Sequence, residues 1–168
     1  NPDKDLWRKK LHLREEQKLY FSRIEYCNLH PVFPESGDSR YIYSPKALLF
    51  SGIANNRPFI DYLVGKYQIM GVLKFMDHKN YTPGDISRIE SLGQQYPTAA
   101  IITTEKDATR LINHPQLDET LKASIYILPV EIEFLQGQQE SFNEKIIGYV
   151  RANSRNSILH QDKDANRS

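Results

Sequence analysis

The sequence predicts an α/β fold with an open, mostly parallel sheet and helices on both faces. Strand-like and helical segments alternate from residue 46 to residue 152, which is typical of such a sheet. The strand-like segments are apolar almost throughout, as expected for parallel strands that are buried on both faces. We expect one domain over residues 1–152. From residue 153 the chain is polar and lacks periodicity, so we expect residues 153–168 to form a disordered tail.

The first forty residues predict a helix, a strand and a loop. Residues 5–18 have a helical pattern, with Asp5 as a possible cap. Residues 19–26 are rich in aromatic and branched side chains, which favour a strand. Residues 28–40 contain several prolines, a glycine and an aspartate, which indicate a loop.

The alternation then begins. Short apolar runs predict strands at residues 46–53, 67–75, 99–104 and 124–134. Apolar residues at helical spacing predict helices at residues 57–67, 83–96, 105–113 and 140–152. Right-handed crossovers place the carboxyl ends of parallel strands along one edge of the sheet, and open α/β sheets bind their ligands there.

Composition excludes some classes of protein. The 22 basic and 21 acidic residues leave a formal charge of +1, which argues against a dedicated nucleic-acid binder. The single cysteine, Cys27, cannot form an internal disulfide, so we expect a reducing compartment. No apolar run approaches the ~20 residues of a membrane span, so we expect a soluble chain. The histidines lack metal-ligand spacing, and we predict no metal site in this chain.

Three polar segments follow three of the predicted strands. They are SGIANNRPF at residues 51–59, FMDHKNYT at residues 75–82 and TTEKDATRL at residues 103–111. Because the strands are predicted to be parallel, we expect these segments to converge at one edge of the sheet although they lie far apart in sequence.

In the first segment, Gly52 permits a tight turn, and Asn55 or Asn56 can cap the next helix. A helix N-terminus beside a glycine turn suits an anion such as phosphate, but the same residues also suit a plain structural turn. A phosphate-binding P-loop is absent, because the Gly65–Lys66 pair lacks the upstream glycine.

The second segment contains Asp77 and His78. A histidine with a near-neutral pKa can relay a proton or orient a carboxylate base. Adjacent residues need not touch, and many single histidines are surface or structural residues. Both interpretations stay open on the residues alone.

The third segment begins with Thr104, Glu105, Lys106 and Asp107 at the expected start of a helix. Acidic residues there are favourable against the helix dipole, which is a sufficient structural reason for Glu105 and Asp107. Lys106 is not explained by the dipole. It can contact a phosphate, or it can pair with an acid from a neighbouring loop.

Taken together, the motifs GIANNRPF, F-x-DHKNYT and TTEKDATRL resemble, in order and spacing, the C-terminal half of the tetraacyldisaccharide 4'-kinases, the lipid A kinases of Gram-negative bacteria. The resemblance extends from about residue 5 to residue 150. Three positions depart from the family pattern: Asn56 and Met76 replace prolines, and Lys79 replaces a frequent second histidine.

The resemblance implies a P-loop-kinase-like α/β/α fold whose P-loop lies in an N-terminal lobe outside this chain. It implies transfer of the ATP γ-phosphate to the 4'-hydroxyl of tetraacyldisaccharide 1-phosphate, a lipid A precursor, at the cytoplasmic face of the inner membrane. ATP and Mg²⁺ would be bound mainly by the N-terminal lobe. The protein would also have peripheral contact with the inner membrane. The helix around Trp7 in this chain is a candidate for that contact, although its short basic cluster favours an ordinary solvated helix.

The resemblance also implies roles for named residues. His78 and Asp77 are expected to be catalytic, and the nucleotide or phosphate cleft is expected to include Gly52, Asn55, Thr104, Glu105, Lys106 and Asp107. The chain alone is expected to be inactive. The alternative is a stand-alone nucleotide- or sugar-phosphate-binding module without catalysis, which the same architecture also permits.

Overall fold

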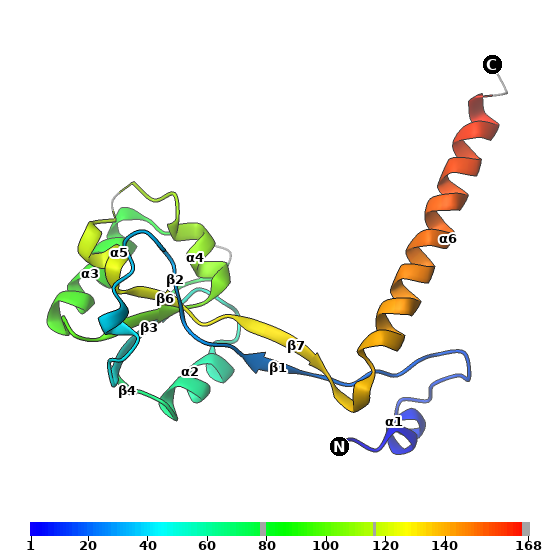
Figure 1. The fold of residues 1–168 in the computed structure, drawn as a ribbon, viewed down its shortest axis with the longest axis horizontal. Coiled ribbons are helices and arrows are strands. Elements are labelled where there is room, and N and C mark those ends of the chain that lie inside the picture. The colour runs from blue at the N-terminus through cyan, green and yellow to red at the C-terminus, as the bar shows by residue number, and fades with distance from the viewer. Residues whose placement is uncertain (78–79, 116, 166–168) are drawn as a thin grey trace. The chain divides into compact units, whose positions relative to one another are not determined.

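The computed structural model describes residues 1–77, 80–115 and 117–165 (Figure 1). Contacts group the chain in two compact units. We call Tyr26–Val130 the sheet unit, and Asn1–Glu25 with Glu131–Ser168 the terminal unit. Each is described by itself.

The sheet unit contains a five-stranded sheet in the order β2-β6-β5-β3-β4. The strands are β2 (His30–Pro31), β3 (Lys46–Ser51), β4 (Gln68–Lys74), β5 (Ala100–Thr103) and β6 (Ile125–Ile127). β3 is parallel to β4 and β5, β5 is parallel to β6, and β2 alone runs antiparallel to its neighbour. The predicted mostly parallel sheet is therefore confirmed.

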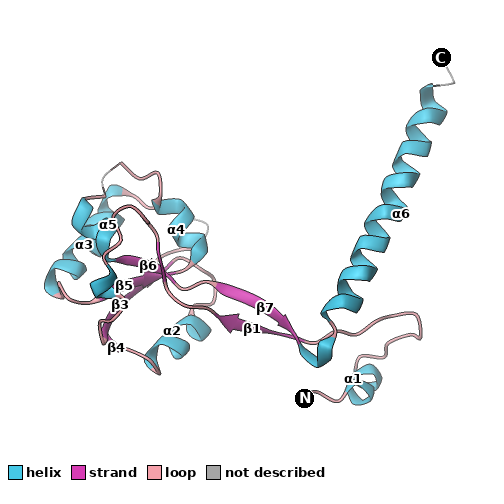
Figure 2. Cartoon of the chain, viewed as in Figure 1, coloured by secondary structure: helices cyan, strands magenta, loops and turns pink. Residues whose placement is uncertain are grey.

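Helices cover both faces of this sheet (Figure 2). They are α2 (Arg57–Val64), α3 (Pro83–Gln95), α4 (Glu105–Leu111) and α5 (Glu119–Ser124). On one face, Phe59 and Leu63 of α2 pack against Ala47 and Leu49 of β3. On the other face, the apolar residues of α3, α4 and α5 pack against Leu48 and its neighbours. Alternate residues of β3 thus supply both cores, as the uninterrupted apolar run requires.

The helices start where their first residues can satisfy free backbone N–H groups. Thr82 and Asp85 form a reciprocal capping box at the start of α3, with Pro83 in the first turn. Thr104 caps α4 by accepting a hydrogen bond from the N–H of Asp107. These caps place the loops after β4 and β5 directly before two helices.

The terminal unit contains α1 (Lys4–Lys10) and α6 (Gln139–Ala165), and a short 3₁₀ turn at Leu135–Gly137 precedes α6. β1 (Ser22–Tyr26) and β7 (Val130–Phe134) pair in a two-stranded sheet, and all their residues except Tyr26 and Val130 belong to the terminal unit. Within the terminal unit, the ring of Tyr20 packs edge-on against Phe134 and Phe142.

Several element boundaries differ from the sequence prediction. The strand predicted at residues 124–134 is two strands, β6 and β7, because Pro129 lies between them and has no N–H to donate to a ladder. The helix predicted at residues 5–18 ends at Lys10, and His12 adopts a left-handed φ of 51°.

Three further elements were not predicted. α5 occupies residues 119–123, which the sequence analysis left unassigned, and Ser124, which it placed in a strand. The predicted loop at residues 28–40 contains β2 and the start of a 3₁₀ turn, Ser39–Tyr41. β2 is only two residues long and includes a proline, so it gives no strand pattern.

The sequence analysis expected one domain over residues 1–152 and a disordered tail over residues 153–168. Contacts define two units within residues 1–152, and α6 continues into the tail as far as Ala165. The tail contains neither glycine nor proline from residue 153 onward, so nothing in its backbone chemistry interrupts a helix. The domain boundary at residue 152 stays a prediction. In the part of the chain that the structure describes, no helix combines the length and apolarity needed to cross a membrane.

Candidate functional site

The loops after β3, β4 and β5 meet at one edge of the sheet unit. The backbone N–H of Gly52, directly after β3, donates to Asp107 Oδ2 in the first turn of α4 at 3.0 Å. The hydroxyl of Tyr81, at the end of the loop after β4, donates to Asp107 Oδ1 at 2.9 Å. The structure therefore brings together segments that are 26 and 55 residues from Asp107 in sequence.

Asp107 is the central acceptor of this edge, and its side chain is 0% exposed. Its Oδ2 also accepts from the Thr104 hydroxyl at 2.7 Å, and its Oδ1 also accepts from the Arg110 guanidinium at 3.1 Å. An ionised carboxylate offers about four lone-pair positions. These four donors therefore fill the acceptor positions of the carboxylate, and Asp107 links the three loops to one another. We call Asp107 and its four donors the Asp107 network. The predicted place of Asp107 in a nucleotide or phosphate cleft stays a prediction.

Arg110 offsets the energetic cost of burying the Asp107 carboxylate. It lies one helical turn after Asp107, and its side chain is only 12% exposed. The same guanidinium nitrogen donates to the backbone carbonyl of Gly52 at 3.2 Å. A buried carboxylate is strongly unfavourable unless it is paired and hydrogen-bonded, and Arg110 supplies both conditions.

Gly52 is required by the close approach of these loops. A Cβ at this position would lie 3.1 Å from Asp107 Oδ1, 3.1 Å from the Arg110 guanidinium and 3.2 Å from the Met76 carbonyl oxygen. The Gly52 N–H donates to Asp107. A plain structural turn, one of the two interpretations of this glycine, therefore accounts for its backbone hydrogen bond.

Tyr81 anchors its loop through both ends of its side chain. The residue is 7% exposed, and its ring packs edge-on against Phe50 and Phe75 with centroids 5.8 and 5.0 Å away. Burial raises the pKa of the Tyr81 phenol, and the neighbouring Asp107 carboxylate raises it further. The phenol therefore stays protonated and remains a donor throughout the physiological pH range.

Lys106 pairs with an acid from a neighbouring loop, which is one of the two possibilities that the sequence left open. Its Nζ donates to Asp77 Oδ1 at 2.7 Å, and the two side chains are 42% and 25% exposed. His78, the other predicted catalytic residue, lies outside the described residues.

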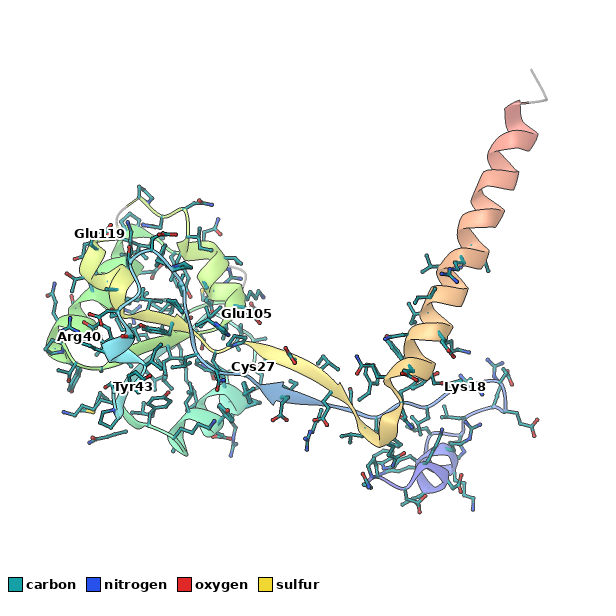
Figure 3. All side chains as sticks on the ribbon, viewed as in Figure 1. Lys18, Cys27, Arg40, Tyr43, Glu105 and Glu119 are labelled. Atoms are coloured by element: carbon teal, nitrogen blue, oxygen red, sulfur yellow. The ribbon has the colours of Figure 1, made fainter. Side chains whose placement is uncertain are left out.

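Asn55 and Glu105 have separate local partners. Asn55 Oδ1 accepts from the N–H of Arg57 at 3.2 Å, at the start of α2. Glu105, labelled in Figure 3, accepts from the N–H of Val130 at 3.4 Å. Of the predicted cleft residues, Gly52, Thr104 and Asp107 thus share one network, while these two do not join it.

A sequence model of the tetraacyldisaccharide-1-P 4'-kinases matches residues 4–151. The chain belongs to the tetraacyldisaccharide 4'-kinase family. This confirms the resemblance that the three motifs indicated.

Curated relatives with the name tetraacyldisaccharide 4'-kinase support the assignment. The relative from Bacteroides fragilis is 44% identical over 174 residues, covering 99% of this chain and 46% of its own length. The relative from Bacteroides thetaiotaomicron is 43% identical over 178 residues, covering 99% and 47%. The chain thus spans about half the length of these relatives. A crystal structure titled as the apo form of LpxK from Aquifex aeolicus in complex with ATP has a TM-score of 0.49 and 17% identity, covering 82% of this chain and 38% of that one.

In this member of the tetraacyldisaccharide 4'-kinase family, two residues of the network escaped the sequence analysis. Arg110 is three residues after Asp107, a spacing that places both on one helix face and was a usable signal. Tyr81 gave no comparable signal, because its contact with Asp107 depends on the path of the whole loop.

The described residues of this kinase-family chain do not fit a Mg²⁺ site. All four acceptor positions of Asp107 are filled by protein donors, and no group of three or more His, Cys, Asp or Glu side chains lies together within residues 1–77, 80–115 and 117–165. A cavity of about 380 Å³, lined by Tyr41, Glu90, Tyr96 and others, contains none of the predicted site residues.

Proposed function

We propose that this chain is the C-terminal lobe of a lipid A 4'-kinase. The whole protein would transfer the γ-phosphate of ATP to the 4'-hydroxyl of tetraacyldisaccharide 1-phosphate. The observation that carries this proposal is the family match over residues 4–151, together with relatives of that name at 44% identity. Its supporting observation is that one residue from each of the three family motifs, Gly52, Tyr81 and Asp107, meets the others at one edge of the sheet.

Phosphoryl transfer, the reaction that this lobe would assist, is catalysed mainly by the correct placement of the reacting groups. In phosphoryl transfer the attacking hydroxyl loses its proton to a base, a P–O bond forms to the 4'-oxygen, and the bond to the ADP oxygen breaks. The protein accelerates this step by alignment and by stabilising dispersed negative charge. In our proposal His78 orients the carboxylate base or adjusts its pKa, and Asp77 holds the imidazole.

The remaining parts would come from outside this chain. ATP and Mg²⁺ would be held mainly by an N-terminal lobe with a P-loop, which agrees with the saturated carboxylate of Asp107. Closure of the two lobes would exclude water, which otherwise competes with the sugar hydroxyl for the phosphoryl group.

The lipid substrate would be met at the cytoplasmic face of the bacterial inner membrane. α1 has features that support peripheral contact, because Leu6, Trp7 and Leu11 are exposed beside a basic last turn of Arg8, Lys9 and Lys10. Exposed apolar side chains beside basic ones favour an anionic membrane surface.

The test is phosphate transfer from ATP to tetraacyldisaccharide 1-phosphate by the whole protein, measured on purified material. We expect turnover by the parent and a loss of about 100-fold or more in kcat for His78→Ala, the range of general acid–base effects. His30→Ala, on the exposed side of β2, is the matched control and should keep the parent rate.

Two outcomes would contradict this proposal. A folded whole protein that transfers no phosphate would exclude the kinase assignment. Tight ATP binding by residues 1–168 alone, measured by calorimetry, would favour the nucleotide- or sugar-phosphate-binding module, because a lobe without a P-loop should bind ATP weakly.

A further inference from the structure

Two consecutive residues of α4 hold the two ends of one loop. The loop runs from the end of β4 at Lys74 to the cap of α3 at Thr82. Near its start, Asp77 accepts from Lys106 Nζ at 2.7 Å. At its end, Tyr81 donates to Asp107 Oδ1 at 2.9 Å. Residues 78–80 lie between these contacts.

We propose that Lys106 and Tyr81 are positioning residues for phosphoryl transfer, which hold the loop after β4 at two described points, Asp77 and Tyr81. This inference rests on the proposed kinase function. Neither side chain needs to touch the reacting atoms. Each acts through the loop, Lys106 on Asp77 directly and Tyr81 through the buried carboxylate of Asp107.

The Tyr81 contact is the rigid one. Both Tyr81 and Asp107 are buried, and Asp107 is bonded in turn to the Gly52 N–H and to Arg110. A displacement of Tyr81 would break a hydrogen bond inside a saturated network, which is costly in a low-dielectric interior. The end of the loop is therefore fixed relative to the turn after β3.

The contact between Lys106 and Asp77 is partly exposed. Its exposure makes it possible to distinguish a positioning role of Lys106 from a structural one. Ion pairs between partly exposed side chains add little to stability. If the Lys106–Asp77 pair had only a structural role, its loss would change almost nothing. If the pair orients the loop, its loss lowers turnover while the melting temperature stays unchanged.

Small displacements matter here because alignment supplies much of the acceleration. An error of about 1 Å at the reacting groups can cost about 100-fold in rate. We therefore expect loss of one contact to lower kcat by between about 10-fold and about 100-fold, with the KM values for ATP and for the disaccharide unchanged.

The experiment uses the whole kinase with Lys106→Met and Tyr81→Phe, each conservative in shape. Lys106→Arg tests whether a second cation restores turnover. The matched controls are Lys122→Met, which removes an ion pair with Glu119 on α5, and Tyr43→Phe at an 85% exposed position. We expect a lower kcat in both test variants, partial recovery with Lys106→Arg, and parent values in both controls.

Three results would overturn the proposal. The first is a kcat equal to that of the parent in both test variants. The second is a loss of kcat in Lys106→Met that is accompanied by a matching loss of melting temperature. The third is a raised KM for ATP in Lys106→Met. The last result would indicate direct contact between Lys106 and a phosphate.

A second measurement separates this inference from the proposed function. Amide hydrogen exchange of residues 75–82 should be faster in both test variants than in the parent, because each loses a contact that holds this loop. If the parent transfers no phosphate, the kinase proposal fails, and faster exchange then still supports the two-ended attachment of the loop. Unchanged exchange overturns it.

Discussion

The sheet unit and the terminal unit differ in how they bury their apolar residues. Every buried hydrophobic residue in the described part of the chain lies between Val32 and Leu128, inside the sheet unit. In the terminal unit, α1 buries none of its residues, and α6 exposes Ile146, Ile147 and Tyr149 by 47%, 47% and 70%. The sheet unit therefore has a core of its own, whereas the described residues of the terminal unit provide none.

The same difference appears in the charges. The sheet unit pairs Asp107 and Arg110 at 0% and 12% exposure. The terminal unit pairs Arg23 with Glu133 at 58% and 47% exposure. The hydrogen bond to Glu133 raises the pKa of the Arg23 guanidinium, but water screens the pair. We therefore expect the buried ion pair of the sheet unit to contribute more to the free energy of unfolding than the exposed ion pair of the terminal unit.

The largest expected effect is that of Asp107→Ala. The substitution leaves the guanidinium of Arg110 buried without its carboxylate and removes the acceptor of Gly52, Thr104 and Tyr81. Breaking a buried ion pair from one side costs about 3–5 kcal/mol. Urea denaturation should show a loss of this size in the free energy of unfolding.

The control for this prediction is Asp61→Ala. Asp61 pairs with Arg57 at 3.4 Å, but the two side chains are 66% and 85% exposed. We expect a change within about 0.5 kcal/mol. Asp61 also lies in the sheet unit, so this control isolates burial. Similar losses for both substitutions would mean that burial, which distinguishes the ion pairs of the two units, does not decide the energetic cost of losing a carboxylate.

A matched pair of apolar truncations compares the two units directly. Leu63 of α2 is 0% exposed, and Leu63→Ala should cost about 2–5 kcal/mol because it opens a cavity in a packed core. Ile147 of α6 is 47% exposed, and Ile147→Ala should change the free energy of unfolding by about 0.5 kcal/mol or less. Both are measured by urea denaturation of residues 1–168. A large loss for Ile147→Ala would show that the terminal unit has an apolar contact that its exposure does not reveal.

Prediction from the sequence succeeded where a local pattern decides the structure. The runs KALLFS and AIIT became β3 and β5, fully buried or nearly so, because a continuous apolar run is stable only between two layers of helices. Thr82 and Thr104 begin helices at the predicted places, since capping depends on residues within one turn.

Prediction failed where one residue or a distant contact decides. Pro129 divides a strand-like run into two strands, and the run contains no other sign of a break. The convergence of Gly52 and Asp107 followed from sheet topology alone. The partners Tyr81 and Arg110 did not, because a buried carboxylate selects its donors by three-dimensional position. The roles assigned to Asp77 and His78 stay predictions.

The smallest expected effect concerns the pH dependence of the sheet unit. Burial, and then Asp107, raise the pKa of Tyr81 in the folded state above its ordinary value of 10.0. The phenol is protonated in both folded and unfolded states below pH 10, so its contribution to stability is fully present there. Above pH 10 the unfolded chain releases this proton and the folded chain keeps it, so stability falls as pH rises.

Tyr81→Phe separates this contribution from the other tyrosines. At pH 8 the substitution should cost about 1–2 kcal/mol, because a hydrogen bond to a carboxylate is lost. Between pH 10 and pH 11 its stability should fall less steeply than that of the parent, by up to about 1.4 kcal/mol per pH unit, the limit for one proton. Tyr43→Phe, at an 85% exposed position, should run parallel to the parent in urea denaturation at pH 8, 10 and 11. If Tyr81→Phe also runs parallel, Tyr81 ionises without opening the sheet unit, and the Asp107 network is less tightly closed to water than its burial indicates.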